Sequence, residues 1–589
     1  MSETNPHQPG KKFQIGLTMA GAISAGAYTA GVIDYLLETL QRWEEVKGKQ
    51  ADMPSHEVEI PVITGASAGG MTAVMIAKAL YQETKPVERE LKLEENSSNI
   101  LYDCWVNLTE SVGSPVMLDQ LLSLKDLQRY EQIPYYSKLK SLFNSSFIED
   151  IANKHIPNSA SNHTPAGFVP KDLELLLTLT NIQGFKFVEK FNPTATSSTQ
   201  MSGVYKVVKH ADYGNFVIGK NSYANDGRIP IDFGSPNKED LNTLRQCAMA
   251  TGAFPVGLSY REVKRKVQYI KDNPWINLDP SIPLEVGKDQ THNALMVDGG
   301  AINNEPYKMA IRLLNKRRLG NKSEDYLSEP LRNAAILMVD PFPTEEENES
   351  KSNFDPGLMG IIPALVNAMQ EQLLYSSTKG NEFYRESQNN RPLYLISPTR
   401  KDKNAQTIIG NKAIACGSLG GFGGLLSRDF RQHDFFLGRR NCQRFLQKYF
   451  VVEWKDEYHT NPNMFENDYY QLVLSGYSGK KEAVERYKVF NEGKWYVPII
   501  PDTKYSRAEE QNKMEVKQPE WKKIDFCKDI YRIKPQIKKR LKTATYAAFD
   551  PGLFVKVAIN LGFGVLGNTV SDMVLKHIKN ELESWELLE

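Results

Sequence analysis

The sequence predicts an α/β protein, in which strands and helices alternate along the chain. Twice, an apolar, strand-like run leads through a turn of small residues into a helical segment; the two runs are residues 13–18 and 60–64. Farther on, residues 172–181 and 293–298 are again strand-like, and a helical pattern over 241–252 lies between them. This alternation is typical of an α/β fold.

The first strand-like run is followed by residues 19–31, nearly all of them small. A helix with an apolar stripe from Val32 to Trp43 comes next. A glycine-rich turn before a helix forms a cradle of backbone N–H groups for an anion. Ala27 follows Gly26 where a P-loop needs its lysine, and the glycines lack the dinucleotide-binding spacing. We therefore expect the cradle to bind the oxyanion of an ester intermediate and not a nucleotide.

The second strand-like run ends in Gly65-Ala66-Ser67-Ala68-Gly69, a G-x-S-x-G sequence between a strand and a helix. This setting is typical of a nucleophile elbow, in which the glycines let the turn close and the serine projects at the carboxyl end of the strand. The N-terminus of the following helix directs N–H groups and the positive end of its dipole at the same point. The alternative interpretation is a small-residue turn that only lets a helix pack closely on a strand.

The strand at 293–298 ends in Asp298-Gly299-Gly300. An aspartate at the carboxyl end of a strand, followed by two glycines, can approach a neighbouring turn closely. A serine nucleophile needs a base within hydrogen-bond reach, and burial raises the pKa of a carboxylate toward the working pH. Asp298 is far from Ser67 in the sequence, so only the fold can join them. The alternative role of Asp-Gly-Gly is a simple turn.

Composition excludes several classes of function. The chain has 589 residues and a formal net charge of +1, so nothing in its charge indicates a nucleic-acid partner. We find no signal peptide at the N-terminus and no apolar run long enough to cross a membrane, and we expect a cytoplasmic protein. The five cysteines are scattered without metal-ligand spacing. We therefore expect no metal and no cofactor.

Three of these motifs, in this order, resemble the patatin-like phospholipases. They are the glycine loop continuing from Gly26, the G-x-S-x-G sequence and Asp298-Gly-Gly, and the resemblance covers roughly residues 11–345. It implies a three-layer α/β fold with a largely parallel central sheet. It also implies a Ser67–Asp298 dyad without a catalytic histidine, which hydrolyses phospholipids or other acyl esters in the manner of a phospholipase A or lysophospholipase. The motif glycines are Gly26, Gly65, Gly69, Gly299 and Gly300.

The glycine loop departs from the family pattern, which is usually G-G-G-x-R/K-G. Ala22 and Ile23 replace two glycines and Ala25 replaces the basic residue. Backbone N–H groups are unaffected by such changes, so an oxyanion hole is still expected. Its predicted donors are the N–H groups of Gly21, Ala22, Ile23 and Ala68. The missing cation indicates that activity is lower than is usual in the family or needs another basic residue.

Further elements are predicted beyond the resemblance. Residues 333–340 and 391–397 are expected to be strands, with an acidic linker after the first. Residues 358–374 are expected to be a helix that either packs on the sheet or acts as a lid. The glycine cluster at 416–425 is interpreted as a tight turn over the core with a charge network around Asp434, with a ligand site as the alternative.

We predict a hydrolase domain over residues 1–450 and an accessory, mainly helical region over 451–589, because the composition shifts after 450. The basic run 532–542 precedes a mixed apolar segment, and together they allow a peripheral contact with an anionic membrane. The alternative is a helix face packed on the protein itself. The oligomeric state is left open.

Two functions of different classes remain. The first is hydrolysis of lipid acyl esters by the Ser–Asp dyad. The second is a catalytically weak signalling or ligand-binding module that retains the patatin fold. The presence of both Ser67 and Asp298 favours the enzyme.

Overall fold

The structure is a computed structural model of the chain. It describes residues 12–95, 97–109, 117–127, 139–161, 163–190, 204–219, 226–287, 289–320, 326–343, 392–504, 515–549 and 553–589. The predicted helix at 358–374 and the acidic linker before it lie outside these ranges.

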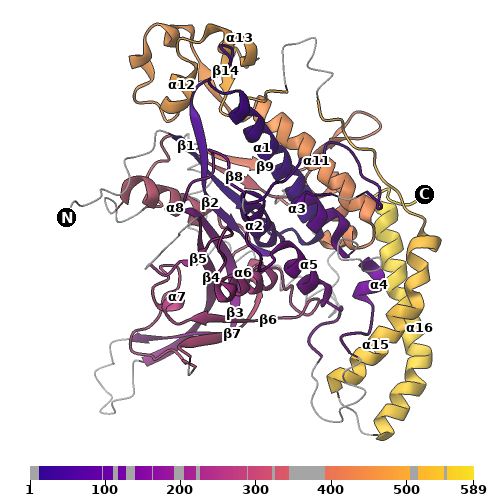
Figure 1. Cartoon of the computed structure of the whole chain (residues 1–589). Helices are drawn as coiled ribbons and strands as arrows, with labels where there is room; N and C mark the ends of the chain where they lie inside the picture. The colour runs from indigo at the N-terminus through magenta and orange to yellow at the C-terminus, as the bar shows by residue number, and fades with distance from the viewer. Residues whose placement is uncertain are drawn as a thin grey trace, which may run out of the picture.

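The described residues form a nine-stranded mixed sheet with the order β5-β4-β3-β2-β1-β8-β9, in which β7 pairs with β3 and β6 (Figure 1). Most of the pairings are parallel, including β1 with β2 and β8, and β2 with β3. The antiparallel pairings join β3 to β4 and to β7, and β6 to β7. The predicted α/β class and the largely parallel sheet are confirmed. The strands are β1 (Lys12–Met19), β2 (Glu57–Gly65), β3 (Leu173–Lys190), β4 (Val204–Ile218), β5 (Ile229–Ile231), β6 (Arg261–Lys266), β7 (Thr291–Asp298), β8 (Ala334–Val339) and β9 (Leu393–Ile396).

Helices cover both faces of the sheet. Successive residues of a strand point to opposite faces, and the apolar side chains on each face pack into a separate core. In β2, Ile63 packs into the larger core and Val62 into the smaller one. The larger core is covered by α1, α2, α6 and α11, and the smaller one by α8, which gives three layers. These helices are α1 (Gly26–Val46), α2 (Ser67–Ala79), α6 (Lys238–Thr251), α8 (Tyr307–Leu319) and α11 (Arg428–Lys448); shorter ones are α3 (Ile100–Tyr102), α4 (Met117–Leu121), α5 (Phe147–His155) and α7 (Gln268–Lys271).

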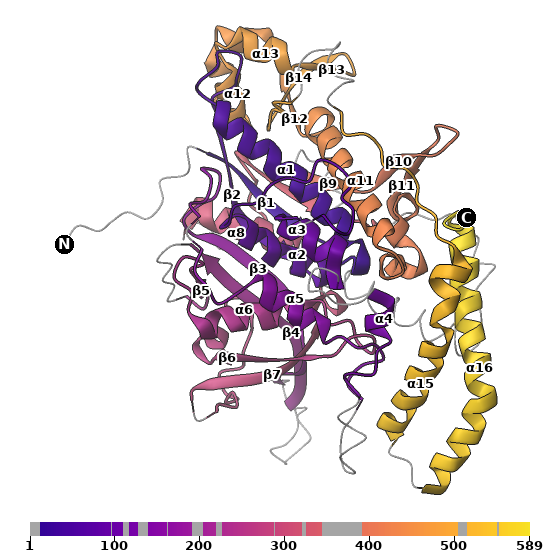
Figure 2. The same ribbon diagram turned by 45° about the vertical axis from the view of Figure 1, so that its right-hand side comes forward.

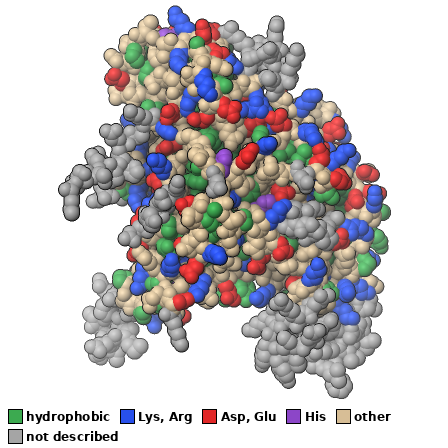
Figure 3. All heavy atoms as spheres, in the orientation of Figure 1, with side chains coloured by type: hydrophobic (Ala, Val, Ile, Leu, Met, Phe, Trp, Pro, Cys, Tyr) green, Lys and Arg blue, Asp and Glu red, His purple; other side chains and the backbone are tan. Residues whose placement is uncertain are grey.

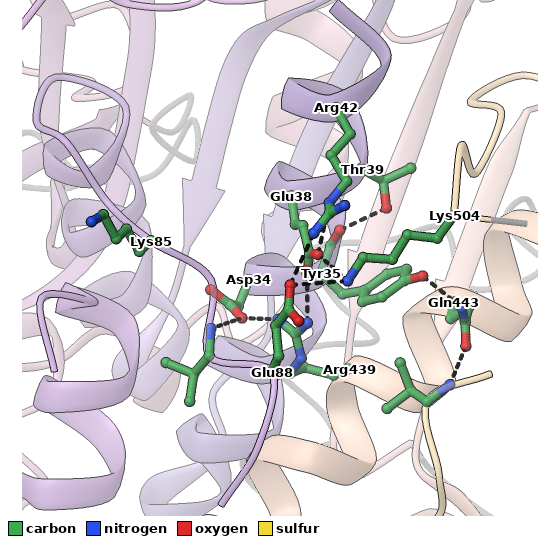
Figure 4. A network of polar contacts seen from close by, with 12 residues as sticks. Asp34, Tyr35, Glu38, Thr39, Arg42, Lys85, Glu88, Arg439, Gln443 and Lys504 are labelled. Carbon is green, nitrogen blue, oxygen red and sulfur yellow. Dashed lines mark hydrogen bonds and ion pairs between the residues drawn. The ribbon is translucent and has the colours of Figure 1, made fainter. Parts of the chain in front are cut away.

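Helices α1 and α11 pack closely although they are far apart in the sequence. A Cβ at Gly31 would lie 1.8 Å from the Phe435 carbonyl oxygen, so only glycine allows this approach. Farther along the contact, Arg439 of α11 forms ion pairs with Asp34 and Glu38 of α1, and all three side chains are buried (Figure 4). Each buried charge has a partner, as burial requires.

Residues after 450 add a small sheet and further helices. The sheet has the order β12-β14-β13 and lies with α12 and α13 at the top of Figure 1. Its side chains, such as Val452 and Trp454, belong to the same large core as α1. The domain boundary near 450 stays a prediction. The remaining elements are β10 (Thr399–Lys401), β11 (Thr407–Ile409), β12 (Val451–Trp454), β13 (Val489–Asn491), β14 (Lys494–Pro498), α12 (Gln471–Tyr477), α13 (Lys481–Tyr487), α15 (Lys534–Phe549) and α16 (Leu553–Ser584).

The basic run 532–542 forms most of α15, which lies beside α4 (Figure 2). The Arg540 side chain is buried, and its two terminal nitrogens each lie 2.8 Å from a carboxylate oxygen of Asp126. Its Nε donates to the Leu142 carbonyl at 2.6 Å. Arg532 pairs with Asp119 of α4 at 2.8 Å. Part of the basic run therefore packs on the protein itself.

Within the described residues, no helix combines the length and the apolar character needed to cross a membrane. Basic and acidic side chains are interspersed over the face shown in Figure 3. This mixture agrees with the near-zero net charge of the sequence.

Candidate active site

The G-x-S-x-G turn joins β2 to α2, as predicted, and Ser67 is the first residue of the helix. Ser67 has a φ of 51°, a left-handed conformation that is uncommon for a residue with a side chain. A Cβ at Gly65 would lie 2.5 Å from the Gly69 carbonyl oxygen, and one at Gly69 would lie 2.3 Å from that of Met19. Both glycines are therefore needed for the turn to close, as in a nucleophile elbow.

Asp298 lies within hydrogen-bond reach of Ser67. The Ser67 hydroxyl donates to Oδ2 of Asp298 at 2.6 Å, and the Gly300 N–H donates to Oδ1 at 2.7 Å. Burial raises the pKa of Asp298 to about 7, although these two hydrogen bonds act in the opposite direction. The structure therefore brings together a serine and a carboxylate that can accept its proton near neutral pH.

Sheet register explains how distant parts of the chain meet here. Met19 at the end of β1 is paired with Gly65 at the end of β2, and Leu179 of β3 is paired with Asp298. The Asp-Gly-Gly turn must also approach β3 closely, since a Cβ at Gly299 would lie 2.0 Å from the Thr178 carbonyl oxygen. Ser67 thus follows the carboxyl ends of the parallel strands β1 and β2, where ligands bind in open α/β sheets, and Asp298 reaches it from β7, which runs antiparallel to β3.

Thr251, the last residue of α6, supports the elbow, and the sequence interpretation missed it. Its hydroxyl oxygen accepts a hydrogen bond from the Ser67 backbone N–H at 3.0 Å. The methyl and hydroxyl groups of Thr251 also lie against Gly70, where a Cβ would be only 2.7 Å from each. The contact fixes the elbow from the side of α6. A threonine near a helix end gives no sequence signal for such a role.

The predicted oxyanion loop lies beside Ser67, with one difference from expectation. A Cβ on Gly21 would lie 3.0 Å from Cβ of Ser67, so the loop and the elbow are in contact. The Gly21 N–H, however, donates to the Asn304 carbonyl at 3.2 Å and is already used. Within the part of the chain that the structure describes, the N–H groups of Ala22, Ile23 and Ala68 have no hydrogen-bond acceptor. These three remain available to an oxyanion.

The glycine cluster at 416–425 packs on this loop. The Ser24 hydroxyl donates to the Gly421 carbonyl at 2.5 Å and accepts from the Gly424 N–H at 3.0 Å. The cluster is itself fixed by Asp434, whose carboxylate accepts from the N–H groups of Ala415 and Cys416 at 2.9 and 2.8 Å. The expected tight turn is present. In place of the expected charge network, Asp434 is bound mainly by backbone N–H groups, with His433 Nδ1 at 2.7 Å from its Oδ1.

An apolar cavity of about 120 Å³ opens beside the Ser67–Asp298 pair. Its walls come from the segment around α3, from α4 and α5, from the turn after α6 and from the glycine cluster. Among the described residues that line it, Asp298 alone carries a charged side chain. The lining residues include Ile23, Met71, Met75, Trp105, Leu108, Met117, Leu121, Phe143, Phe147, Ile151, Phe254, Leu258, Phe422 and Leu425.

With this geometry described, comparison with known proteins gives the family. The model of the family described as patatin-like phospholipase matches residues 17–311. The chain belongs to the patatin-like phospholipase family. The patatin match runs from β1 into α8 and includes the glycine loop, the elbow and Asp298. The glycine cluster that packs on the loop lies outside it.

Two similar proteins add detail. The uncharacterized protein y4iI of Sinorhizobium fredii is 27% identical over 98% of this chain and 83% of its own length. The crystal structure of VipD from Legionella pneumophila matches 73% of this chain and 66% of the VipD chain, just under two thirds of it, at 12% identity. The TM-score of that match is 0.22, which is too low to support an argument.

Proposed function

We propose that the protein is a serine hydrolase that cleaves acyl esters of lipids, of the phospholipase A or lysophospholipase type. The observation that supports it best is the 2.6 Å hydrogen bond from Ser67 to Asp298 at one end of an apolar cavity. Family membership supports the reaction class. The geometry supports Ser67 as the nucleophile and Asp298 as its base.

In the proposed reaction, Asp298 accepts the Ser67 proton as the hydroxyl oxygen attacks the ester carbonyl carbon. The N–H groups of Ala22, Ile23 and Ala68 donate to the oxyanion that forms, and the positive end of the α2 dipole adds to their effect. Collapse of this intermediate expels the alcohol, which takes the proton from Asp298. Water then attacks the acyl-serine with Asp298 again as base, and the fatty acid leaves while Ser67 regains its proton.

The cavity supports a long acyl chain as the group that is bound. Nearly all of its lining is aliphatic, aromatic or methionine side chain, which releases water favourably when an alkyl chain enters. A charged headgroup would find no counter-ion there and would have to stay outside.

The proposed reaction uses backbone donors and a carboxylate base, so it needs no cofactor. We propose that it takes place in the cytoplasm.

Labelling with a fluorophosphonate tests the proposal directly. This reagent forms a covalent bond with an activated serine, so the wild type should be labelled and Ser67→Ala should not. Ser427, whose hydroxyl accepts from the Asp429 N–H as a helix cap, provides a matched serine for the control Ser427→Ala. Ser67→Ala should also hydrolyse a short-chain ester at less than a few per cent of the wild-type rate. Labelling that persists in Ser67→Ala would refute the assignment.

A further inference from the structure

Three consecutive apolar residues are exposed in the turn between α6 and β6. They are Phe254, Pro255 and Val256; the Val256 side chain is 70% exposed and Phe254 is 38% exposed. Leu142, from the segment before α5, lies beside them, because its N–H donates to the Val256 carbonyl at 2.8 Å. The Leu142 side chain is 42% exposed. We call these four residues the apolar tip. Water contact with so many large apolar side chains in one place is unfavourable and indicates a binding surface.

The apolar tip is rigidly connected to the site. The carbonyl of Ala253, immediately before the tip, accepts from the Asp298 N–H at 3.1 Å, and that of Gly257, after it, accepts from the Phe143 N–H at 3.1 Å. Val256 has a φ of 69°, a conformation that is costly for a β-branched residue. The surrounding hydrogen bonds maintain this strain, which is common at functional turns. The tip is therefore fixed in an exposed position.

The apolar tip also forms part of the rim of the cavity. Phe254 lines the cavity, and so does Gly257, just beyond the tip. The Phe254 ring meets that of Phe422, on the glycine cluster, edge to face at a centroid distance of 5.6 Å. Phe254 is thus both exposed and part of the cavity wall, and it connects the apolar tip to the space beside Ser67.

Basic side chains flank the apolar tip. Lys140 is exposed two positions before Leu142. Arg540 of α15 also contacts the tip, because its Nε donates to the Leu142 carbonyl at 2.6 Å. Apolar residues with basic groups beside them match the two layers of a lipid surface, in which anionic headgroups lie above the acyl chains.

We propose that the apolar tip is the surface through which the protein contacts a lipid–water interface, with the mouth of the cavity turned toward the lipid. The inference rests on the proposed function and adds where the substrate enters. A lipid molecule that leaves an aggregate has to move its acyl chain into the cavity. The tip provides an apolar path for that chain, which avoids exposing it to water.

Val256→Asn is the sharpest variant. Asparagine adopts positive φ more readily than valine, so the fold should be at least as stable, while the exposed apolar side chain is lost. Val256 is not among the cavity-lining residues. Ile409→Asn is the matched control, because Ile409 is 54% exposed in β11 and does not line the cavity either.

Two assays should then diverge. On vesicles of phosphatidylcholine with phosphatidylglycerol, Val256→Asn should hydrolyse phospholipid about tenfold more slowly than the wild type, since an apolar anchor of this size contributes about that factor. On a monomeric short-chain ester, the rates should agree within about twofold. Adding Leu142→Ser should reduce the vesicle rate further. Ile409→Asn should match the wild type in both assays.

Vesicle co-sedimentation in a Ser67→Ala background separates this inference from the proposed function, because it needs no catalysis. Ser67→Ala should sediment with the vesicles, and Ser67→Ala/Val256→Asn should sediment about tenfold less. Equal sedimentation of the two would overturn the inference even if the enzyme hydrolyses esters. A wild type that is dimeric in solution and becomes monomeric with Val256→Asn would also overturn it, because the tip would then bind a second copy of the chain.

Discussion

Two aspartates, Asp298 and Asp340, have similar positions in the sheet. Asp298 is the last residue of β7, and Asp340 follows the last residue of β8. In each, one carboxylate oxygen accepts a backbone N–H from two residues farther on, at 2.7 Å from Gly300 and 2.8 Å from Phe342. Burial raises the pKa of both to about 7.

The two aspartates differ in the group that faces them. Asp298 accepts a hydrogen bond from the Ser67 hydroxyl, whereas Asp340 lies near the carboxylate of Glu305, which raises its pKa further. Burial at a strand end therefore gives both aspartates a pKa suitable for a general base. Of the two, Asp298 is the one that has a nucleophile beside it. A raised pKa marks a candidate, and the neighbouring side chain decides its chemistry.

The largest expected effect is on catalysis through Asp298. Asp298→Asn keeps the shape of the side chain but cannot take the Ser67 proton, so kcat on a short-chain ester should fall by about 10²–10⁴-fold. The matched variant Asp340→Asn should change kcat by less than about twofold. Steady-state kinetics on the short-chain ester, with both variants and the wild type, measures the two changes in kcat. Comparable losses in the two would contradict the distinction between them.

The pH dependence of activity should follow Asp298. Its carboxylate must be ionised to act as base, and its pKa is raised to about 7. The rate constant kcat/KM on a soluble ester should therefore rise with pH and level off above a midpoint near 7, a change of about tenfold between pH 6 and pH 8. A profile that is flat over this range would show that another group limits the reaction.

A smaller effect is expected at Thr251, which binds the elbow but not the substrate. Thr251→Val keeps the volume and removes the acceptor of the Ser67 N–H, so we expect about a tenfold lower kcat, since one buried hydrogen bond contributes about this much. Thr251→Ser retains the hydroxyl and should restore most of the rate. If serine were as poor as valine, the role of Thr251 would be packing alone.

We expect the smallest effect on activity at Asp340. A substitution there should nevertheless change the stability of the fold clearly. Folding raises the pKa of Asp340 from 3.8 to about 7, so folding favours its protonated form. The stability linked to this group is fully present below about pH 4 and is lost as the pH rises through 7, by on the order of 4 kcal/mol. Asp340→Asn does not ionise, so its Tm should exceed that of the wild type at pH 8 and approach it at pH 5. Thermal unfolding at both pH values tests this, and an equal difference at the two would contradict the assignment.

Local patterns were enough to predict the elements that carry the site. The strands ending near Met19, Gly65 and Asp298 are rich in apolar residues and lead into turns of small residues, and the structure places each of them where the pattern indicates. The pairing of Ser67 with Asp298 could be inferred only from family resemblance, because no local pattern records a contact across so much sequence. The structure brings the two side chains together.

The rest of the site could not be predicted, for physical reasons. The hydrogen bond that occupies the Gly21 N–H uses the backbone carbonyl of Asn304, and a backbone acceptor leaves no trace in residue type. Trp105 lines the cavity, but an apolar residue in a helical pattern is equally typical of the core, so its residue type did not reveal this position. The basic run of α15 suggested a membrane contact, yet its Arg540 binds Asp126, which lies 414 positions earlier in the chain.

That contact between Arg540 and Asp126 relates the order of synthesis to the state of the candidate site. The ribosome completes Ser67, Asp298 and the whole patatin-matched region long before it reaches α15. Arg540 is then needed to fix the Ser123 and Leu142 carbonyls, on segments that carry the cavity-lining Leu121 and Phe143. A nascent or truncated chain that stops before residue 532 has the full dyad but lacks these bonds to the cavity wall. Only when α15 has been synthesised and has packed does this part of the cavity wall gain these hydrogen bonds.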